Sequence, residues 1–272
     1  MHLKAVRLHP GKYPTKRRHP FNLPVFLKTR RVELDAPVTF FVGENGTGKS
    51  TLLEALSHAC GFHIWSGPGR SRVENNPYED RLGEYLSLEW ADGRVPGSFF
   101  GADIFRHFAE LLDEWAASDP GQLDYFGGKS LMTQSHGQSL LSFFRARYRI
   151  KGLYLLDEPE AALSPRSQLE LLRILTEGSR AGSAQFIVAT HSPILLACPG
   201  ARILSFDHVP LRTVEYEQTD YFRIYKDFLQ DRARYLDAPH EGRPPLWPRS
   251  TSPSSRPKAA SWFRPSFRSP WR

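Results

Sequence analysis

The stretch that decides the fold is Gly43-Glu44-Asn45-Gly46-Thr47-Gly48-Lys49-Ser50-Thr51, which matches the pattern GxxxxGK[ST]. An apolar run of strand type, Val38–Val42, precedes it, and an apolar helical stretch, Ser50–Ala59, follows. This context predicts a phosphate-binding loop whose backbone N–H groups and helix N-terminus face the phosphates of a nucleotide. We expect Lys49 to reach the β- and γ-phosphates and Ser50 to ligate Mg²⁺.

Two further motifs extend this site. Residues Gly152–Glu158 (GLYLLDE) form an apolar run that ends in two carboxylates. We expect Asp157 to hold Mg²⁺ through water, and Glu158 to act as general base or to orient the attacking water. His191 follows another apolar run, so its imidazole would lie at the same carboxyl edge of the sheet and contact the γ-phosphate. The predicted catalytic residues are Glu158, His191 and Lys49.

Short β-rich runs alternate with helical stretches along residues 1–238, which indicates an α/β fold. The runs VTFFV, LYLL and FIVA are apolar on both faces, as strands covered on both sides of a parallel sheet require. The expected strands are Leu3–Leu8, Val38–Val42, Leu86–Trp90, Leu153–Leu156, Gln185–Ala189, Ile203–Phe206 and Thr213–Tyr216. The expected helices are Ser50–Ala59, Ile104–Ala116, Gln138–Tyr148, Pro165–Glu177 and Thr219–Leu229.

Composition excludes several classes of protein. With 272 residues, 40% hydrophobic and 24% charged, the chain is long enough for one large globular domain. Its longest apolar runs are far too short to span a bilayer, and its first residues lack the apolar segment of a secretory signal, so we expect a cytoplasmic protein without membrane insertion. The two cysteines, Cys60 and Cys198, fit neither a disulfide framework nor a four-ligand zinc site.

Positive charge is concentrated at the two ends of the chain. Residues 1–31 hold nine Lys/Arg and no Asp/Glu, and residues 239–272 hold seven Lys/Arg against one glutamate. The N-terminal segment, which includes Lys16-Arg17-Arg18, fits either a solvated surface loop or contact with nucleic acid or an acidic partner. Eight of the 22 prolines fall in residues 239–272, so we expect a disordered Pro/Ser/Arg-rich tail after a folded region of residues 1–238.

The order GENGTGKST, SHGQS, LLDEPEAALSP and ATHSP resembles the ATP-binding-cassette ATPases, specifically the small stand-alone soluble members called AAA-type ATPases, related to SMC and double-strand-break-repair ATPases. The resemblance covers roughly residues 1 to 230. It implies a P-loop fold with a mostly parallel sheet, flanking helices, a helical arm at approximately residues 99–149 and an antiparallel N-terminal β portion. It also implies an ATP-dependent head-to-tail homodimer, in which Ser135 and Gly137 of one protomer cap the γ-phosphate bound by the other.

This sequence departs from the family pattern at several points. The signature LSGGQ appears as QSHGQ at residues 134–138, without the leucine and the first glycine. The glutamine that usually completes the Mg²⁺ and water shell has no clear counterpart, and Asp103 is the candidate by position. The candidates for stacking on adenine are Tyr13, Phe21 and Phe26, although each fits a core position better.

The nucleotide chemistry leaves the biological output open. The first interpretation is an Mg²⁺-dependent ATP hydrolase whose closing and opening drives or gates another process. The second is an ATP-gated module that binds DNA or a protein and uses hydrolysis to reset, for which residues 1–31 would serve. The third is the cytoplasmic cassette subunit of a transporter. The interval between Lys49 and Asp157 is too short for the coiled-coil arms of SMC-like proteins.

Overall fold

The computed structural model describes residues 1–64, 76–119, 121, 123–124, 128, 130 and 136–236. Ser135 and the tail at 239–272 lie outside these residues, as does the side chain of Asp103. The chain forms two compact units, Met1–Gln230 and Asp231–Arg272. In the second unit the described part includes one short helix, α8 (Ala233–Leu236). The functional motifs and both sheets belong to the first unit.

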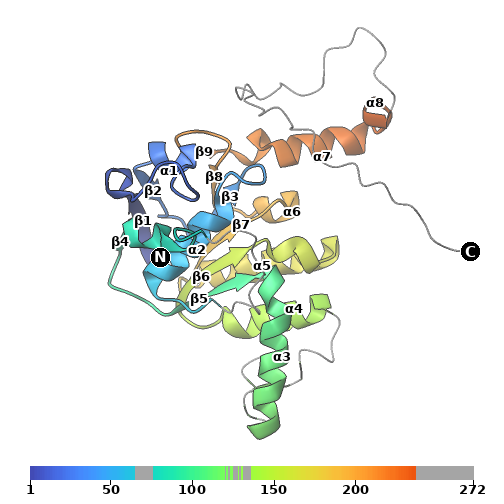
Figure 1. Cartoon of the computed structure of the whole chain (residues 1–272). Helices are drawn as coiled ribbons and strands as arrows, with labels where there is room; N and C mark the ends of the chain where they lie inside the picture. The colour runs from blue at the N-terminus through green and yellow to red at the C-terminus, as the bar shows by residue number, and fades with distance from the viewer. Residues whose placement is uncertain are drawn as a thin grey trace, which may run out of the picture. The chain divides into compact units, whose positions relative to one another are not determined.

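A six-stranded sheet forms the centre of the first unit (Figure 1). Its strand order is β5-β6-β7-β3-β8-β9, and all neighbouring strands are parallel except β8 and β9. Every residue of β3 and β7 is buried, which explains why their sequences are mostly apolar. The bounds are β3 Val38–Val42, β5 Gly97–Gly101, β6 Gly152–Asp157, β7 Ala184–Ala189, β8 Arg202–Ser205 and β9 Arg212–Val214.

Helices cover the two faces of this sheet. Phe41 points to the face covered by α2 (Lys49–Cys60) and the small N-terminal sheet, whereas Phe40 points to the face covered by α4 (His136–Arg147) and α5 (Pro165–Arg180). The remaining described α-helices are α1 Pro24–Lys28, α3 Ala102–Ser118, α6 Pro193–Leu196 and α7 Asp220–Gln230. Both cysteines are buried, Cys60 at the end of α2 and Cys198 after α6.

A small antiparallel sheet, in the order β2-β1-β4, packs on the α2 side, with β1 at Leu3–Leu8, β2 at Arg31–Glu33 and β4 at Leu86–Trp90. The buried amide of Gln185, in β7, joins it to the main sheet. Gln185 Oε1 accepts the N–H groups of His2 and Leu3 at 2.8 and 2.7 Å. Its Nε2 donates to the carbonyls of Leu3 and Leu34 at 2.9 and 2.7 Å. One side chain thus holds four backbone groups of the small sheet and its flanking residues.

The expected fold class is confirmed: a mostly parallel sheet flanked by helices, with an antiparallel N-terminal β portion. Each expected strand and helix is present, with some ends shifted by a few residues. The sequence analysis missed α1, β2, β5, α6 and α8. Residues 99–101, assigned to the helical arm, belong to β5, which pairs in parallel with β6. This pairing needs a glycine at position 97, because a Cβ there would lie 2.1 Å from Leu153 O.

Candidate functional site

The phosphate-binding loop connects β3 to α2, and its glycines adopt conformations that other residues rarely reach. Gly43, Gly46 and Gly48 have φ values of 142°, 80° and 105°. At Gly48 a Cβ would also lie 2.9 Å from Cζ of Phe26, which packs beneath the loop. The loop therefore has the strand–glycine loop–helix geometry that the sequence predicts.

Lys49 lies at the start of α2 and is almost fully buried, with 4% of its surface exposed. Its Nζ donates to Gly43 O at 2.6 Å and to Glu44 O at 3.0 Å, so the ammonium group contacts carbonyls of the loop itself. Burial lowers the pKa of Lys49, and the nearby carboxylate of Glu158 opposes that shift. The cation is thus placed where phosphate oxygens could replace the carbonyls as its partners.

The ends of β3 and β6 bring the predicted metal ligands together. Ser50 Oγ donates to Asp157 Oδ1 at 3.0 Å. Burial raises the pKa of Asp157 to about 7, and the Ser50 hydrogen bond acts in the opposite direction. A hydroxyl beside one carboxylate fits Mg²⁺, which takes oxygen ligands and in nucleotide sites binds few protein groups besides phosphates and water. Among the described residues no group of three or more His, Cys, Asp or Glu side chains could hold a metal by itself.

Glu158 and His191 form a second pair at the same edge of the sheet. His191 Nε2 lies 3.2 Å from Glu158 Oε1. Glu158 has a left-handed backbone, with φ 46° and ψ 51°, and its N–H donates to Ala189 O at 2.9 Å. A non-glycine residue in this region costs energy, and such strain is concentrated at functional positions. The backbone turn directly after β6 therefore directs the Glu158 side chain toward His191, at the end of the neighbouring strand β7.

Four side chains that support this site were missed from the sequence. Glu160 Oε1 accepts the backbone N–H of His191 at 2.6 Å, and Asp207 Oδ1 accepts that of Glu44 at 2.8 Å. The others are Gln168, which accepts a hydrogen bond from Ser192 Oγ, and Tyr221, which contacts His191. The DEPE sequence was a usable signal for Glu160, whereas the other three come from segments outside the motifs.

The remaining predicted residues lie in different places. Thr47 Oγ1 donates to Glu44 O at 2.8 Å and tightens the turn of the loop, while Asn45 is exposed and Thr51 lies in the first turn of α2. Gly137 lies in the first turn of α4, and the atoms nearest to its missing side chain belong to Ala162, Leu163 and Ser167 rather than to the loop. Its predicted role across a dimer stays a prediction, as does that of Ser135.

The three aromatic candidates for adenine stacking are core residues. Phe21 and Phe26 are fully buried, and Tyr13 is 9% exposed. The Tyr13 and Phe21 ring centroids lie 4.7 Å apart, and the Tyr13 hydroxyl donates to Phe26 O at 3.3 Å. The preference for a core position was correct, because all three rings are buried: Tyr13 and Phe21 pack against each other, and Phe26 packs against Gly48 of the loop.

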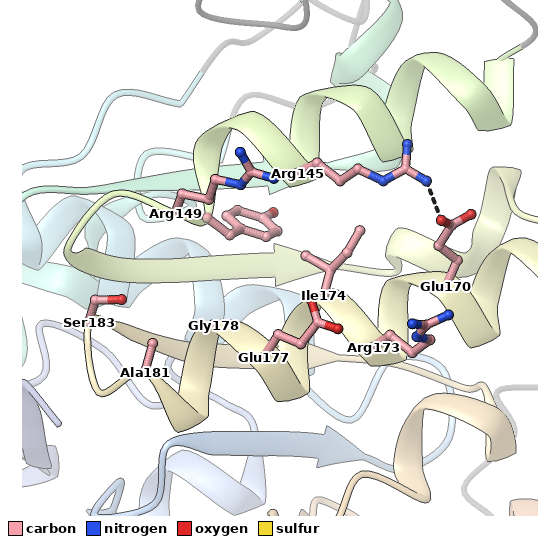
Figure 2. Close-up of a pocket in the computed structure, with 10 residues that line it drawn as sticks. Arg145, Arg149, Glu170, Arg173, Ile174, Glu177, Gly178, Ala181 and Ser183 are labelled. Atoms are coloured by element: carbon pink, nitrogen blue, oxygen red, sulfur yellow. Dashed lines mark hydrogen bonds and ion pairs between the residues drawn. The ribbon is translucent and has the colours of Figure 1, made fainter.

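Several cavities among the described residues lie outside the loop, and two of them adjoin α5. One, of about 780 Å³, is mostly apolar and lies between α5, α6 and α7, with His191 on its wall. The other, of about 450 Å³, lies between α4 and α5 and is lined by Arg145, Arg149, Arg173, Glu170 and Glu177 (Figure 2). Arg145 and Glu170 form an ion pair across it. No residue of the phosphate-binding loop, Asp157, Glu158 or His191 lines this second cavity.

Comparison with known proteins places these features in a family. Residues 21–81 match the family model "AAA domain", and residues 139–197 match "AAA domain, putative AbiEii toxin, Type IV TA system". The chain is 31% identical over 170 residues to the thiamine import ATP-binding protein ThiQ of Cereibacter sphaeroides, an alignment that covers 56% of this chain and 69% of the relative. The chain belongs to the ATP-binding-cassette ATPases.

A second curated relative and one solved structure also resemble this cassette ATPase. The hemin import ATP-binding protein HmuV of Rhodopseudomonas palustris is 28% identical over 226 residues, which cover 72% of this chain and 82% of the relative. The SMC head domain from Thermotoga maritima aligns with a TM-score of 0.43 and 18% identity, over 79% of this chain and 99% of that one. Family membership supports ATPase activity in general for this cassette. Within the described residues, the cassette has no helix long and apolar enough to cross a membrane.

Proposed function

We propose that this chain is an Mg²⁺-dependent ATP hydrolase of the cytoplasm, and that two copies close head to tail around two ATP molecules. This proposal rests on one observation: two pairs of residues in contact lie together at one edge of the sheet. Ser50 and Asp157 are hydrogen-bonded, and Glu158 and His191 lie in contact, at the carboxyl ends of the adjacent strands β6, β7 and β3. Ligands of parallel α/β sheets bind at this edge.

Each of these residues has a defined task in the proposal. The loop amides and Lys49 bind the phosphates, and Ser50 and Asp157 hold Mg²⁺, which neutralises phosphate charge when bound. Glu158 takes a proton from the attacking water or orients it, and His191 contacts the γ-phosphate. Ser135 and Gly137 of the second copy complete the site. Because a site of this kind works by positioning and charge, its residues need to be held rigidly.

The test is a Glu158→Gln variant that is assayed for ATP turnover and for mass by light scattering. We expect it to bind ATP, to hydrolyse it at least about tenfold more slowly than the wild type, and to double in mass only with Mg²⁺–ATP. Glu177→Gln, an exposed change of the same kind on α5, is the matched control. Near-normal turnover would remove Glu158 from its role, and a monomeric mass with ATP bound would refute the homodimer.

A transporter cassette subunit is the second candidate, and the names of the relatives favour it. Two of them are named as ATP-binding proteins of thiamine and hemin import. This candidate predicts that the chain co-purifies with a membrane protein from its own cells and that the partner raises the ATPase rate. Full activity together with failure to associate with any membrane protein would count against it.

Binding of DNA or an acidic protein is the third candidate. Lys16, Arg17 and Arg18 are all exposed. If they contact phosphates, replacing all three with alanine lowers DNA affinity and reduces its dependence on salt. An unchanged affinity and salt dependence would show that these residues form only a solvated surface.

A further inference from the structure

The hydroxyl of Tyr221, in the first turn of α7, contacts both parts of the nucleotide site. Its oxygen lies 2.8 Å from Gly43 O, at the base of the phosphate-binding loop, and 2.7 Å from His191 Nδ1. Its ring meets the imidazole edge to face, with the ring centroids 5.2 Å apart and the planes at 80°. Tyr221 thus joins the loop to the residue that faces Glu158.

The directions of these two hydrogen bonds follow from the number of available protons. A carbonyl oxygen can only accept, so the single proton of the Tyr221 hydroxyl goes to Gly43 O. The same hydroxyl must then accept from His191, which requires the hydrogen on Nδ1. Burial raises the pKa of Tyr221 and keeps this phenol protonated. The ring is therefore fixed with Nδ1–H toward Tyr221, and its Nε2 lies 3.2 Å from Glu158 Oε1, where one further hydrogen between the two atoms completes the contact.

Gly43 O has a second donor, which is Lys49 Nζ at 2.6 Å. When Lys49 turns to a phosphate oxygen, this carbonyl loses that partner and retains Tyr221. A buried carbonyl that keeps one hydrogen bond avoids most of the cost of losing both. Tyr221 therefore permits Lys49 to move without leaving the loop carbonyl unsatisfied.

The start of α7 is itself well anchored. Thr219 is 4% exposed, and its Oγ1 accepts the N–H of Phe222 at 3.3 Å as a helix cap. Next to it, the hydroxyl of Tyr216 donates to Pro193 O at 3.0 Å, which ties this segment to the start of α6. These contacts anchor the start of α7, and with it Tyr221, to the chain segment that follows His191.

We infer that Tyr221 is a positioning residue for ATP hydrolysis: it fixes the tautomer and direction of the His191 ring and supports the base of the phosphate-binding loop. This inference rests on the proposed function, since the ring matters only if His191 acts on bound nucleotide. Tyr221 itself is not placed against the phosphates and acts through the two groups that it contacts.

The test compares Tyr221→Phe with the full-length wild type. Phenylalanine keeps the ring packing and removes only the hydroxyl. We expect kcat for Mg²⁺–ATP hydrolysis to fall about tenfold, the size expected for one lost hydrogen bond that matters in the transition state, with KM changed less than threefold. In ¹⁵N-labelled protein without nucleotide, the His191 signal, assigned with His191→Gln, is expected to show Nδ1–H in the wild type and loss of this preference in Tyr221→Phe.

Tyr225→Phe is the matched control, because Tyr225 lies one turn later on α7 and is 54% exposed. We expect it to leave both readouts unchanged. A kcat of Tyr221→Phe equal to that of the control, or an unchanged His191 tautomer, would overturn the inference. If the wild type hydrolyses no ATP, the proposed function fails, and the NMR comparison still decides whether Tyr221 holds the His191 ring.

Discussion

Replacing Gln185 with leucine tests how the two sheets are held together. The leucine side chain fills a similar space but can neither accept the N–H groups of His2 and Leu3 nor donate to the carbonyls of Leu3 and Leu34. Gln185, Leu3 and Leu34 are fully buried, so water cannot easily replace these hydrogen bonds. The variant therefore leaves four backbone groups without their partner.

The expected magnitude follows from that count. Each buried polar group left unsatisfied costs about 1–3 kcal/mol, and local relaxation favours the low end of this range. Four groups give a loss of about 4 kcal/mol in the free energy of unfolding. Total stabilities of domains are about 5–15 kcal/mol, so the loss is a large fraction of the whole. For a domain of this size it corresponds to a Tm lower by about 10 °C.

Urea unfolding followed by circular dichroism measures this loss, and Thr39→Val is the control. Thr39 is a fully buried polar residue of β3, the strand next to β7, but its Oγ1 has no hydrogen-bond partner among the described residues. We expect Thr39→Val to change the free energy of unfolding by less than about 1 kcal/mol, in the stabilising direction. A loss below about 1 kcal/mol in Gln185→Leu, or equal effects of the two changes, would refute the role given to Gln185.

Two other changes test the site and the edge strand. Because the pKa of Asp157 is raised to about 7, the folded chain holds more protons than the unfolded chain between about pH 4 and pH 7, and its stability falls as pH rises through that window. In EDTA, Asp157→Asn should therefore raise the free energy of unfolding by about 4 kcal/mol at pH 8 and hardly change it at pH 4. Equal gains at both pH values would contradict this. Gly97→Ala should lower the free energy of unfolding by about 2 kcal/mol, because its Cβ would meet Leu153 O and the Phe62 ring. Gly11→Ala serves as the control, because a Cβ at Gly11 has open space around it. Equal stability of the two alanine variants would show that β5 adapts.

The sequence was sufficient to predict the parts of the candidate site that lie in one short stretch of chain. The phosphate-binding loop, the carboxylates at the end of β6 and His191 after β7 were recognised because each lies at the end of a buried strand. Parallel strands then place these ends at one edge. The motifs alone do not show which strands are neighbours. The strand order supplies this, and it brings Ser50 into contact with Asp157 and Glu158 into contact with His191.

The parts that were missed depend on contacts between distant segments. Asp207 and Tyr221 contact the loop from elements after β7, and nothing in their local sequence marks them. Gln185 looked like one polar residue in an apolar strand, although its partners lie at the other end of the chain. The strand β5 was hidden because a five-residue run between two glycines has no periodicity to distinguish it from an irregular segment.

The burial of both cysteines makes this chain convenient for site-specific labelling. Burial raises the pKa of Cys60 to about 12 and also raises that of Cys198, so neither thiol readily forms the reactive thiolate while the chain is folded. A maleimide dye should therefore react with one introduced cysteine, for example at Leu229 of α7, which is 74% exposed. Fluorescence energy transfer between two such labelled copies could then follow their association on addition of nucleotide, without first removing the native thiols.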